Sequence, residues 1–515
     1  MTLLAQLVDT SNRVSAAPAR TAKVAELAAC LRSLAPGEIE IAVLLLSGGI
    51  PQGRSGIGPS ALRAAAAVSA AKEPALSVLE LNRRLEEVAA IRGTGSTAQR
   101  ANALRDLFCL ATPAEQDFLM RLLLAQLRQG ALTGVMIDAI AAAASLSVAE
   151  VRRGAMYGGL RATARVALLE GTSALQRFQL EILSPLAPML AQTAADTGEA
   201  LQQLQGNVAF EWKMDGARIQ AHRSADVVRI FTRNLNDVSA AIPEIVESLR
   251  ALPANDFVLD GEAIVLEAAG RPAPFQVTMR RFGRKLHVEQ LRAKLPISAF
   301  YFDCLRLDGV SLADRPAHER FEALARAVPP RLLMPRIVTA SRQEAQEFYD
   351  GALAAGHEGV MAKALDAPYE AGNRGASWLK IKRSHTLDLV VLAAEWGHGR
   401  RSGKLSNLHL GASDPNTGEY VMLGKTFKGL TDAMLEWQTK ELLAREVRHD
   451  QWAVYVRPEL VVEVAFSDLQ GSPRYAGGVA LRLARVKRYR QDKTAEQADD
   501  MTAVRRIYAA QSSGT

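Results

Sequence analysis

The segment FEWKMDGAR, at residues 210–218, sets a lysine between two carboxylates. If its first half is a strand, the two-residue period of a strand puts Glu211, Lys213 and Asp215 on one face. Gly216 then allows a tight turn. A lysine amine can attack phosphorus once it has lost its proton, with help from a base, a metal-bound substrate or nearby cations. Taken alone, a lysine flanked by acids on a strand is usually a surface ion pair.

Other charged and aromatic residues follow in short β-like runs. They are Arg233 in FTRN, Asp260 and Glu262 in LDGEA, Phe302 and Asp303 in FYFDCL, Glu358 and Lys363 in HEGVMAK, Arg374, Lys380 and Lys382 in RGASWLKIK, and Arg485, Arg490 and Lys493 in RVKRYRQDK. Cations neutralise phosphates, carboxylates hold Mg²⁺ against phosphate oxygens, and an aromatic ring can stack on a base. Each residue also has a structural explanation, since a phenylalanine in an apolar run is more often core. The set as a whole indicates a nucleotide with a metal.

Composition restricts the class of protein without choosing it. The 515 residues carry 62 Lys and Arg against 55 Asp and Glu, a net charge of +7 that suits a polyanionic partner but does not require one. Cys30, Cys109 and Cys304 lie far apart and do not form a zinc motif. Three sparse cysteines suit a reducing cytosol. With no basic leader and no run of about 18 apolar residues, we expect a cytoplasmic protein without membrane segments.

The pattern along the chain changes twice, which predicts three domains. Residues 1–175 are rich in Ala, Leu and Arg and are expected to be helical throughout. Two close prolines in LSPLAPML, residues 183–190, accompany the first boundary. Residues 176–384 mix short strands with helices, which predicts a mostly antiparallel α+β domain. Residues 385–515 show five or six short strands around one helix at 431–447, which is typical of a small barrel such as an OB-fold.

The ordered set of segments resembles the motifs of covalent nucleotidyltransferases, a superfamily that includes DNA ligases, RNA ligases and mRNA capping enzymes. KMDGAR is similar to the nucleophile motif, and FTRN, LDGEA, FYFD, EGVMAK, WLKIK and RQDK match the motifs that follow it. With a helical domain in front, the chain resembles a three-domain bacterial or archaeal ATP-dependent DNA ligase over nearly its whole length. The resemblance implies an all-α DNA-binding domain, an α+β adenylation domain and a C-terminal OB-fold β-barrel.

The resemblance also implies a role for each candidate residue. Lys213 would attack the α-phosphate of ATP and hold AMP, which would pass to the 5′-phosphate of a nick before the 3′-hydroxyl displaces it. Glu211 would recognise the adenine edge and Phe302 would stack on the base. The remaining implied contacts are Arg218 and Arg233 to ribose or phosphates, Glu262 to ribose or a metal, Glu358 to the metal (Mg²⁺ or Mn²⁺), and Arg374, Lys380 and Lys382 to the α-phosphate.

The last motif carries a departure from the family pattern. By resemblance, Arg485, Arg490 and Lys493 would close over ATP and orient its pyrophosphate, then swing away when DNA binds. The family usually has Phe-Pro between the two arginines of the preceding strand. This chain has Leu483 and Ala484 there, which leaves the path of the strand open.

The partner implied by the resemblance is nicked double-stranded DNA. RQGALTG, with Arg128 and Gly130, is the candidate contact of the helical domain with the DNA backbone. Arg128 could equally be a helix C-terminal residue that the helix dipole favours. Backbone contacts carry no sequence code, and binding should weaken with salt at a log–log slope of roughly −0.9 per phosphate contacted. We expect a monomer, which other repair or replication proteins could recruit.

Two other kinds of function remain open at this point. An RNA ligase or a capping guanylyltransferase shares the KxDG core, although capping enzymes normally lack a large helical front domain. A DNA-binding clamp without catalysis would not need Lys213, Glu262, Lys380 and Lys382, all of which are present. An NAD-dependent ligase is disfavoured because three cysteines cannot make the zinc finger of that class. The residues do not distinguish replication, repair and recombination.

Overall fold

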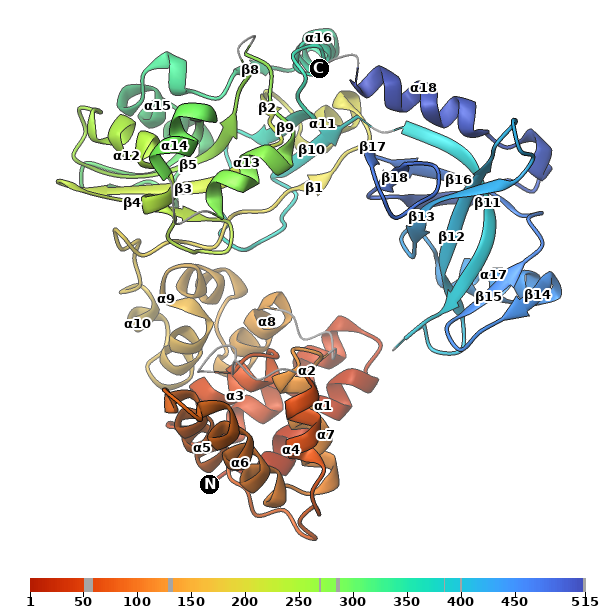
Figure 1. Cartoon of the computed structure of the whole chain (residues 1–515). Coiled ribbons are helices and arrows are strands. Elements are labelled where there is room, and N and C mark those ends of the chain that lie inside the picture. Colours follow the sequence, from red (N-terminus) through yellow and green to blue (C-terminus); the bar gives the residue numbers. More distant parts are fainter. Residues whose placement is uncertain are drawn as a thin grey trace.

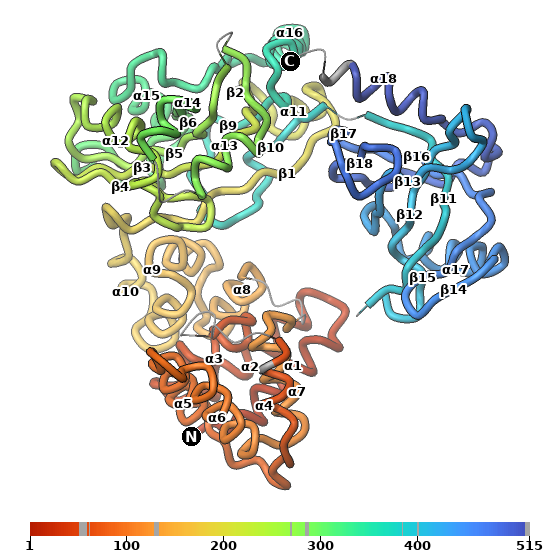
Figure 2. Tube along the Cα trace, in the orientation of Figure 1, coloured from red at the N-terminus to blue at the C-terminus, as the bar shows by residue number. Residues whose placement is uncertain are grey.

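The computed structural model describes residues 1–50, 59–127, 133–267, 270–283, 288–383, 385–398 and 401–512. They form a helical N-terminal part, a middle part with two sheets, and a sheet-rich C-terminal part. Figures 1 and 2 show the middle part joined to both of the others, with the helical part on one side of it and the C-terminal part on another. The expected helical beginning and sheet-rich end are confirmed.

The N-terminal part consists of packed helices that share one apolar core, which includes Leu4, Phe108, Phe118 and Val151. Capping boxes start α7, at Thr112, and α9. Its helices are α1 (Leu4–Ala16), α2 (Arg20–Ser33), α3 (Ile39–Leu46), α4 (Pro59–Ala66), α5 (Val78–Ala90), α6 (Ser96–Cys109), α7 (Pro113–Leu123), α8 (Thr133–Ala144), α9 (Val148–Leu169) and α10 (Thr172–Leu175). The candidate DNA contact at Arg128 and Gly130 lies outside the described residues.

The middle part is built on two five-stranded sheets, in the orders β1-β10-β9-β2-β8 and β4-β3-β5-β6-β7. Neighbouring strands are antiparallel except for β1 and β10, so the mostly antiparallel prediction is confirmed. The strands are β1 (Gln192–Thr193), β2 (Val208–Lys213), β3 (Ala217–Ser224), β4 (Val227–Thr232), β5 (Asp256–Val265), β6 (Ile297–Leu307), β7 (Val310–Ser311), β8 (Arg336–Thr339), β9 (Gly359–Ala364) and β10 (Trp378–Lys382).

Helices cover these sheets. They are α11 (Thr197–Leu204), α12 (Pro243–Arg250), α13 (Phe275–Phe282), α14 (Val288–Lys294), α15 (Ala317–Ala327) and α16 (Arg342–Ala354). Helix α15 contacts β6, whereas α16 contacts β2, β8 and β9. These helices pack against the two sheets. The polar residues of the candidate site lie on or next to β2, β5, β9 and β10.

The C-terminal part contains a seven-stranded antiparallel sheet and a separate two-stranded hairpin, β17–β18. Its elements are β11 (His385–Trp396), β12 (Leu405–Ser413), β13 (Tyr420–Thr426), α17 (Asp432–Ala444), β14 (Glu446–His449), β15 (Ala453–Val456), β16 (Val461–Phe466), β17 (Asp468–Gly471), β18 (Val479–Arg482), β19 (Arg485–Tyr489) and α18 (Met501–Ser512). The helix predicted at 431–447 is too long, because Thr431 caps it and strand β14 begins at Glu446.

Polar contacts join the middle part to its two neighbours. Arg153 Nε on α9 lies 3.0 Å from Asp314 Oδ2. Arg482 Nη1, at the end of β18, lies 3.3 Å from Asp215 Oδ2. Within the described ranges, none of the helices has the length and apolar character that crossing a membrane requires.

Candidate active site

Lys213 is the last residue of β2, at the edge of the candidate site. Glu211 and Lys213 are two residues apart on this strand and so share a face, as predicted. Asp215 does not continue the strand, because β2 ends at Lys213 and the chain turns into β3. Gly216 is needed in this turn, since a Cβ there would lie 2.5 Å from the carbonyl oxygen of Ala263.

Glu358 pairs directly with the candidate nucleophile. Lys213 Nζ lies 2.6 Å from Glu358 Oε2, and Lys382 Nζ lies 2.8 Å from the same oxygen. A backbone hydrogen bond from Glu358 N–H to the carbonyl oxygen of Lys213, 3.0 Å long, brings the two segments together. Burial alone would raise the pKa of Glu358, but the ammonium groups of Lys213 and Lys382 bring that pKa below its usual value. Glu358 is therefore a carboxylate, and it holds both amines.

Glu262, on β5, is a second carboxyl group beside the nucleophile. Burial raises the pKa of Glu262 to about 7, although Lys213 and Arg218 oppose the shift. The negative charges of Asp215 and Glu358 add to it. Three acidic side chains thus lie close enough around Lys213 to affect one another. Carboxylates arranged in this way are suited to a cation that bridges them to phosphate oxygens.

A cluster of cations faces the same region. Burial lowers the pKa of Lys380, and the positive charges of Lys382, Arg374, Lys213 and Arg233 lower it further. These residues come from β2, the turn after β4, the loop before β10, and β10 itself. The fold therefore brings together five cations from three separate segments of the sequence. Such a concentration of positive charge suits a polyphosphate.

Glu211 and Phe302 lie deeper, in a buried group of charged and aromatic side chains. Arg336 Nε donates to Glu211 Oε1 over 2.8 Å, and Lys363 Nζ lies 2.5 Å from Glu211 Oε2. Lys363 Nζ also lies 4.4 Å from the centroid of the Phe302 ring and 4.3 Å from that of Trp378. Phe302 is 8% exposed. Both oxygens of Glu211 thus contact cations, so an adenine base bound here would share these oxygens with Arg336 and Lys363.

Arg218, on β3, is held by a buried carboxylate. Its Nη2 donates to Asp260 Oδ2 over 2.7 Å, and its guanidinium carbon lies 5.4 Å from the centroid of Phe302. Asp260 also accepts hydrogen bonds from Tyr369 and Gln220. The guanidinium therefore lies in a fixed position beside the ring that was predicted to stack on a base.

The last motif does not reach this site in the described arrangement. Arg490 Nη1 lies 2.8 Å from Asp388 Oδ2, and Lys493 Nζ lies 2.6 Å from the same oxygen. Arg485 begins β19, within the same C-terminal part. Arg482 contacts the site instead, through its ion pair with Asp215. The structure thus joins the other predicted residues around Lys213 and leaves Arg485, Arg490 and Lys493 apart from it.

Several residues of the site were not assigned a role from the sequence. Arg336 and Tyr369 lie outside the recognised motifs. Trp378 is part of WLKIK and Arg482 is the first of the two arginines before the last motif, but their contacts with distant segments are visible only in the fold. Asp260 and Lys363 lie in recognised motifs, but their buried partners are visible only in the fold. Asp260 was already a candidate residue of LDGEA together with Glu262, but its contacts with Arg218 and Tyr369 have no local sequence signal.

Comparison with known proteins decides the family. The model of the DNA ligase N terminus matches residues 3–141, that of the ATP dependent DNA ligase domain residues 188–382, and that of the ATP dependent DNA ligase C terminal region residues 401–493. The chain belongs to the ATP-dependent DNA ligase family. As a member of this family it is an enzyme, a DNA ligase that uses ATP.

Relatives of this ligase match over essentially their whole length. A probable DNA ligase of Anaeromyxobacter dehalogenans (strain 2CP-C) is 58% identical over 510 residues, covering 98% of this chain and 99% of the relative. A probable DNA ligase of Mycolicibacterium gilvum (strain PYR-GCK) is 54% identical over 509 residues, with coverages of 98% and 99%. The solved structure Pmar-Lig_PreS3 has a TM-score of 0.60 at 18% identity and covers 94% of this chain and 99% of its own, which supports the fold alone.

Proposed function

We propose that this ligase seals nicks in duplex DNA through a covalent AMP on Lys213. The observation that carries the proposal is the convergence on Lys213 of two glutamates, Glu262 and Glu358, with a group of cations. Lys213 Nζ would attack the α-phosphorus of ATP, forming the P–N bond as the bond to pyrophosphate breaks. The AMP would then pass to the 5′-phosphate of the nick, and the 3′-hydroxyl would displace AMP to form the phosphodiester bond.

The nucleotide contacts follow from the cations and the buried ring. Arg374, Lys380 and Lys382 would hold the α-phosphate, because these cations lie close enough together to lower the pKa of Lys380 beyond the effect of its burial. Arg218 and Arg233 would contact ribose or phosphates. Phe302 would stack on adenine, and Glu211 would accept from its amino group in addition to its present partners.

The carboxylates fit a magnesium ion that is shared with the substrate. Among the described residues there is no group of three or more His, Cys, Asp or Glu side chains that could hold a metal unaided. Mg²⁺ is commonly bound through one or two carboxylates and the oxygens of substrate phosphates. Glu262 and Glu358 would supply those carboxylates, for Mg²⁺ or Mn²⁺. When bound, the ion would neutralise charge on the phosphate oxygens.

The three parts would act as separate domains around DNA. We place their boundaries at 175/176 and 384/385, giving an all-α DNA-binding domain, a nucleotidyltransferase domain and an OB-fold domain. A monomer that closes on a nicked duplex, and that other repair or replication proteins could recruit, fits this organisation. The three free cysteines suit the cytoplasm. Arg485, Arg490 and Lys493 would reach ATP only after the C-terminal domain turns from the arrangement described above.

The decisive experiment is adduct formation with α-labelled ATP and Mg²⁺, followed by addition of nicked DNA. The expected result is an acid-labile AMP on the wild-type protein, lost in Lys213→Ala, and none from labelled GTP. Lys404→Ala is a matched control, since this lysine pairs with Glu436 on the surface of the C-terminal part. Sealing by Lys213→Ala would disprove the nucleophile, and sealing confined to RNA would disprove the DNA substrate.

A further inference from the structure

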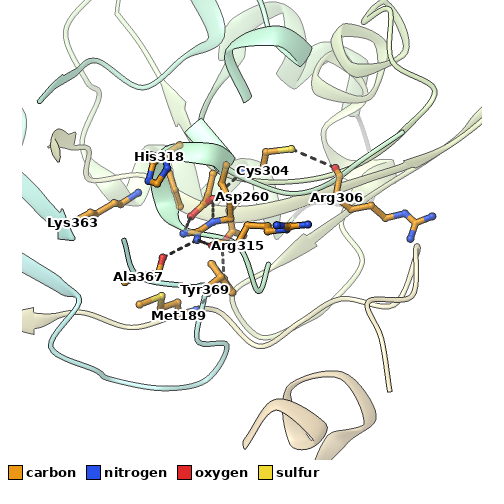
Figure 3. A network of polar contacts seen from close by, with 12 residues as sticks. Met189, Asp260, Cys304, Arg306, Arg315, His318, Lys363, Ala367 and Tyr369 are labelled. Atoms are coloured by element: carbon orange, nitrogen blue, oxygen red, sulfur yellow. Dashed lines mark hydrogen bonds and ion pairs between the residues drawn. The ribbon is translucent and has the colours of Figure 1, made fainter. Parts of the chain in front are cut away.

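Tyr369 lies where three segments of the middle part meet. It belongs to the loop between β9 and β10, and it is 2% exposed. Its neighbours are Met189 in the proline-rich segment before β1 and Asp260 on β5, and Figure 3 shows these side by side with Tyr369. This tyrosine is not among the motif residues predicted from the sequence.

The phenol oxygen of Tyr369 has a complete set of partners. It donates to Asp260 Oδ2 over 2.6 Å. It accepts from the backbone N–H of Met189 over 3.0 Å and from Arg218 Nη2 over 3.1 Å. A phenol has one donor and can accept twice. Each of these capacities is used, so replacing the hydroxyl with hydrogen removes three contacts in a buried place.

Each contact of Tyr369 bears on the orientation of Arg218. Arg218 Nη1 donates to the carbonyl oxygen of Met189 over 2.5 Å, and Arg218 Nη2 donates to Asp260 Oδ2 over 2.7 Å. Tyr369 therefore contacts the guanidinium itself and both of the groups that hold it. The ring adds a fourth constraint, because it packs edge-on against Trp378, with centroids 6.0 Å apart. The Arg218 guanidinium carbon lies 5.5 Å from the centroid of Trp378.

We propose that Tyr369 is a positioning residue for the nucleotide, which it serves by fixing Arg218 beside Phe302. The inference rests on the proposed contact of Arg218 with the ribose or phosphates of ATP. Without the phenol, the guanidinium would keep Asp260 and the Met189 carbonyl as partners, and these two groups could shift relative to each other. The phenol prevents this because it ties the carboxylate and the Met189 backbone to the same edge of the guanidinium. Preorganisation of this kind lowers the entropy lost on binding.

The test is Tyr369→Phe, with Tyr301→Phe as the matched control. Tyr301 is a buried tyrosine on β6, and its hydroxyl has no hydrogen-bond partner among the described residues. Single-turnover adenylation is measured as a function of ATP concentration. For Tyr369→Phe the half-saturating ATP concentration should rise about tenfold, as expected for a lost hydrogen bond to a charged group. The maximal rate should stay within about threefold of the wild-type rate. Tyr301→Phe should change neither value.

A double-mutant cycle separates positioning from general packing. In an Arg218→Gln background, Tyr369→Phe should change the half-saturating ATP concentration by less than about twofold, because residues acting as a unit are not additive. A full tenfold effect in that background would overturn the inference. So would a lowered melting temperature of Tyr369→Phe with unchanged ATP dependence. If Tyr369→Phe does not fold, Asp260→Asn breaks the same link from the other side and must raise the half-saturating concentration.

Adduct formation by the wild-type protein distinguishes an error in the proposed nucleophile from an error in the positioning role of Tyr369. If the wild-type protein formed no adduct with ATP, the proposed nucleophile would be wrong. If the wild-type protein formed the adduct and Tyr369→Phe behaved like Tyr301→Phe, only the positioning role would be wrong.

Discussion

The ammonium of Lys213 lies 2.6 Å from the carboxylate of Glu358, and Lys382 shares that carboxylate. The candidate nucleophile is thus held in an ion pair in this arrangement. An amine in an ion pair keeps its proton and cannot attack phosphorus. Any group that takes over the negative charge of Glu358 would therefore release Lys213 for reaction. A magnesium ion shared with ATP would do so.

Glu358→Gln tests the proposed metal role of this carboxylate, because it keeps the shape of the side chain and removes the charge that would hold the ion. It also frees Lys213 from its ion pair, but we expect the loss of the ion to have the larger effect. Adenylation should fall by about 100-fold, as when one stabilising group is removed from a charged site. The Mg²⁺ concentration for half-maximal rate should rise as well. Labelled ATP titrated with Mg²⁺ measures both. Glu436→Gln, in the surface pair with Lys404, is the control, and adenylation by Glu358→Gln at the wild-type rate would exclude the metal role.

Glu262 should make the stability of the protein depend on pH. Its pKa is raised by burial to about 7 in the folded chain, against 4.5 for an ordinary glutamate. Between these pH values the folded state binds more protons than the unfolded state, so the free energy of unfolding falls as pH rises from about 4.5 to 7. Glu262→Gln removes this contribution to the pH dependence of the free energy of unfolding.

Melting temperatures of the wild type and Glu262→Gln at several pH values measure the effect. The variant should be the more stable protein above pH 7, and its advantage should shrink as pH falls toward 4.5. Glu267→Gln, just after β5, is a control whose difference from the wild type should not follow this pH profile. A constant difference between Glu262→Gln and the wild type would show that Glu262 ionises normally.

Asp303 and Arg320 form a fully buried ion pair, with Oδ1 and Nε 2.8 Å apart. The positive charges of Arg320, Lys363 and Arg336 overcome the effect of burial and lower the pKa of Asp303. Asp303→Asn would leave Arg320 as a buried charge, and should lower the free energy of unfolding by about 3–5 kcal/mol. Denaturation in urea measures this. Glu80→Gln, in an exposed ion pair on α5, should cost far less, and equal losses would argue against the buried-charge explanation.

The local sequence pattern is sufficient to predict an element whose structure depends on its own segment alone. Helix α15 spans residues 317–327, where the apolar residues follow a helical period up to Ala327. The 431–447 prediction failed at its end, because β14 is recruited by pairing with β15, and pairing with a distant strand has no local signal. Glu211 and Lys213 share a strand face as expected, but the partners of Glu211 come from β8 and β9.

The motif at the C-terminus shows that sequence alone does not predict how the domains are arranged. Its residues suggest contact with ATP, yet in this fold Arg490 and Lys493 share Asp388, which lies about a hundred residues earlier in the chain. A sequence motif is compatible with more than one arrangement of domains. The arrangement depends on contacts between the parts, such as the ion pair of Arg482 with Asp215. Such a contact involves only a few polar atoms, so it leaves no periodic pattern in the sequence.

Leu483, which replaces the usual phenylalanine of the family, has a left-handed backbone conformation. Its φ is +58°, and it links β18 to β19 with its side chain 54% exposed. Such a conformation costs a leucine about 1–2 kcal/mol, whereas glycine adopts it freely. Leu483→Gly should therefore leave the stability unchanged or raise it by up to about 1 kcal/mol, after the greater chain entropy of glycine is subtracted. Leu481→Gly, on β18, should destabilise. Equal losses in the two variants would disprove strain at Leu483.

Arg482 should matter for sealing more than for adenylation. Its pair with Asp215 brings the β17–β18 hairpin to the catalytic turn while Arg490 and Lys493 are held at Asp388. If the last motif closes over ATP in the first step, as proposed, we expect the contact of Arg482 with Asp215 to act in a later step. Arg482→Gln should slow sealing of a nick about tenfold, the effect of losing a hydrogen bond to a charged group. Adenylation should stay within about threefold of the wild-type rate.

Single-turnover sealing by purified protein–AMP, compared with adduct formation from ATP, separates the two steps. Arg488→Gln is a matched control, since Arg488 pairs with Glu463 within the C-terminal part and should leave both rates near wild type. A variant that lost adenylation and sealing equally would place Arg482 in the first step. That result would mean that the contact with Asp215 forms when ATP reacts, and that the hairpin and the last motif act on ATP together.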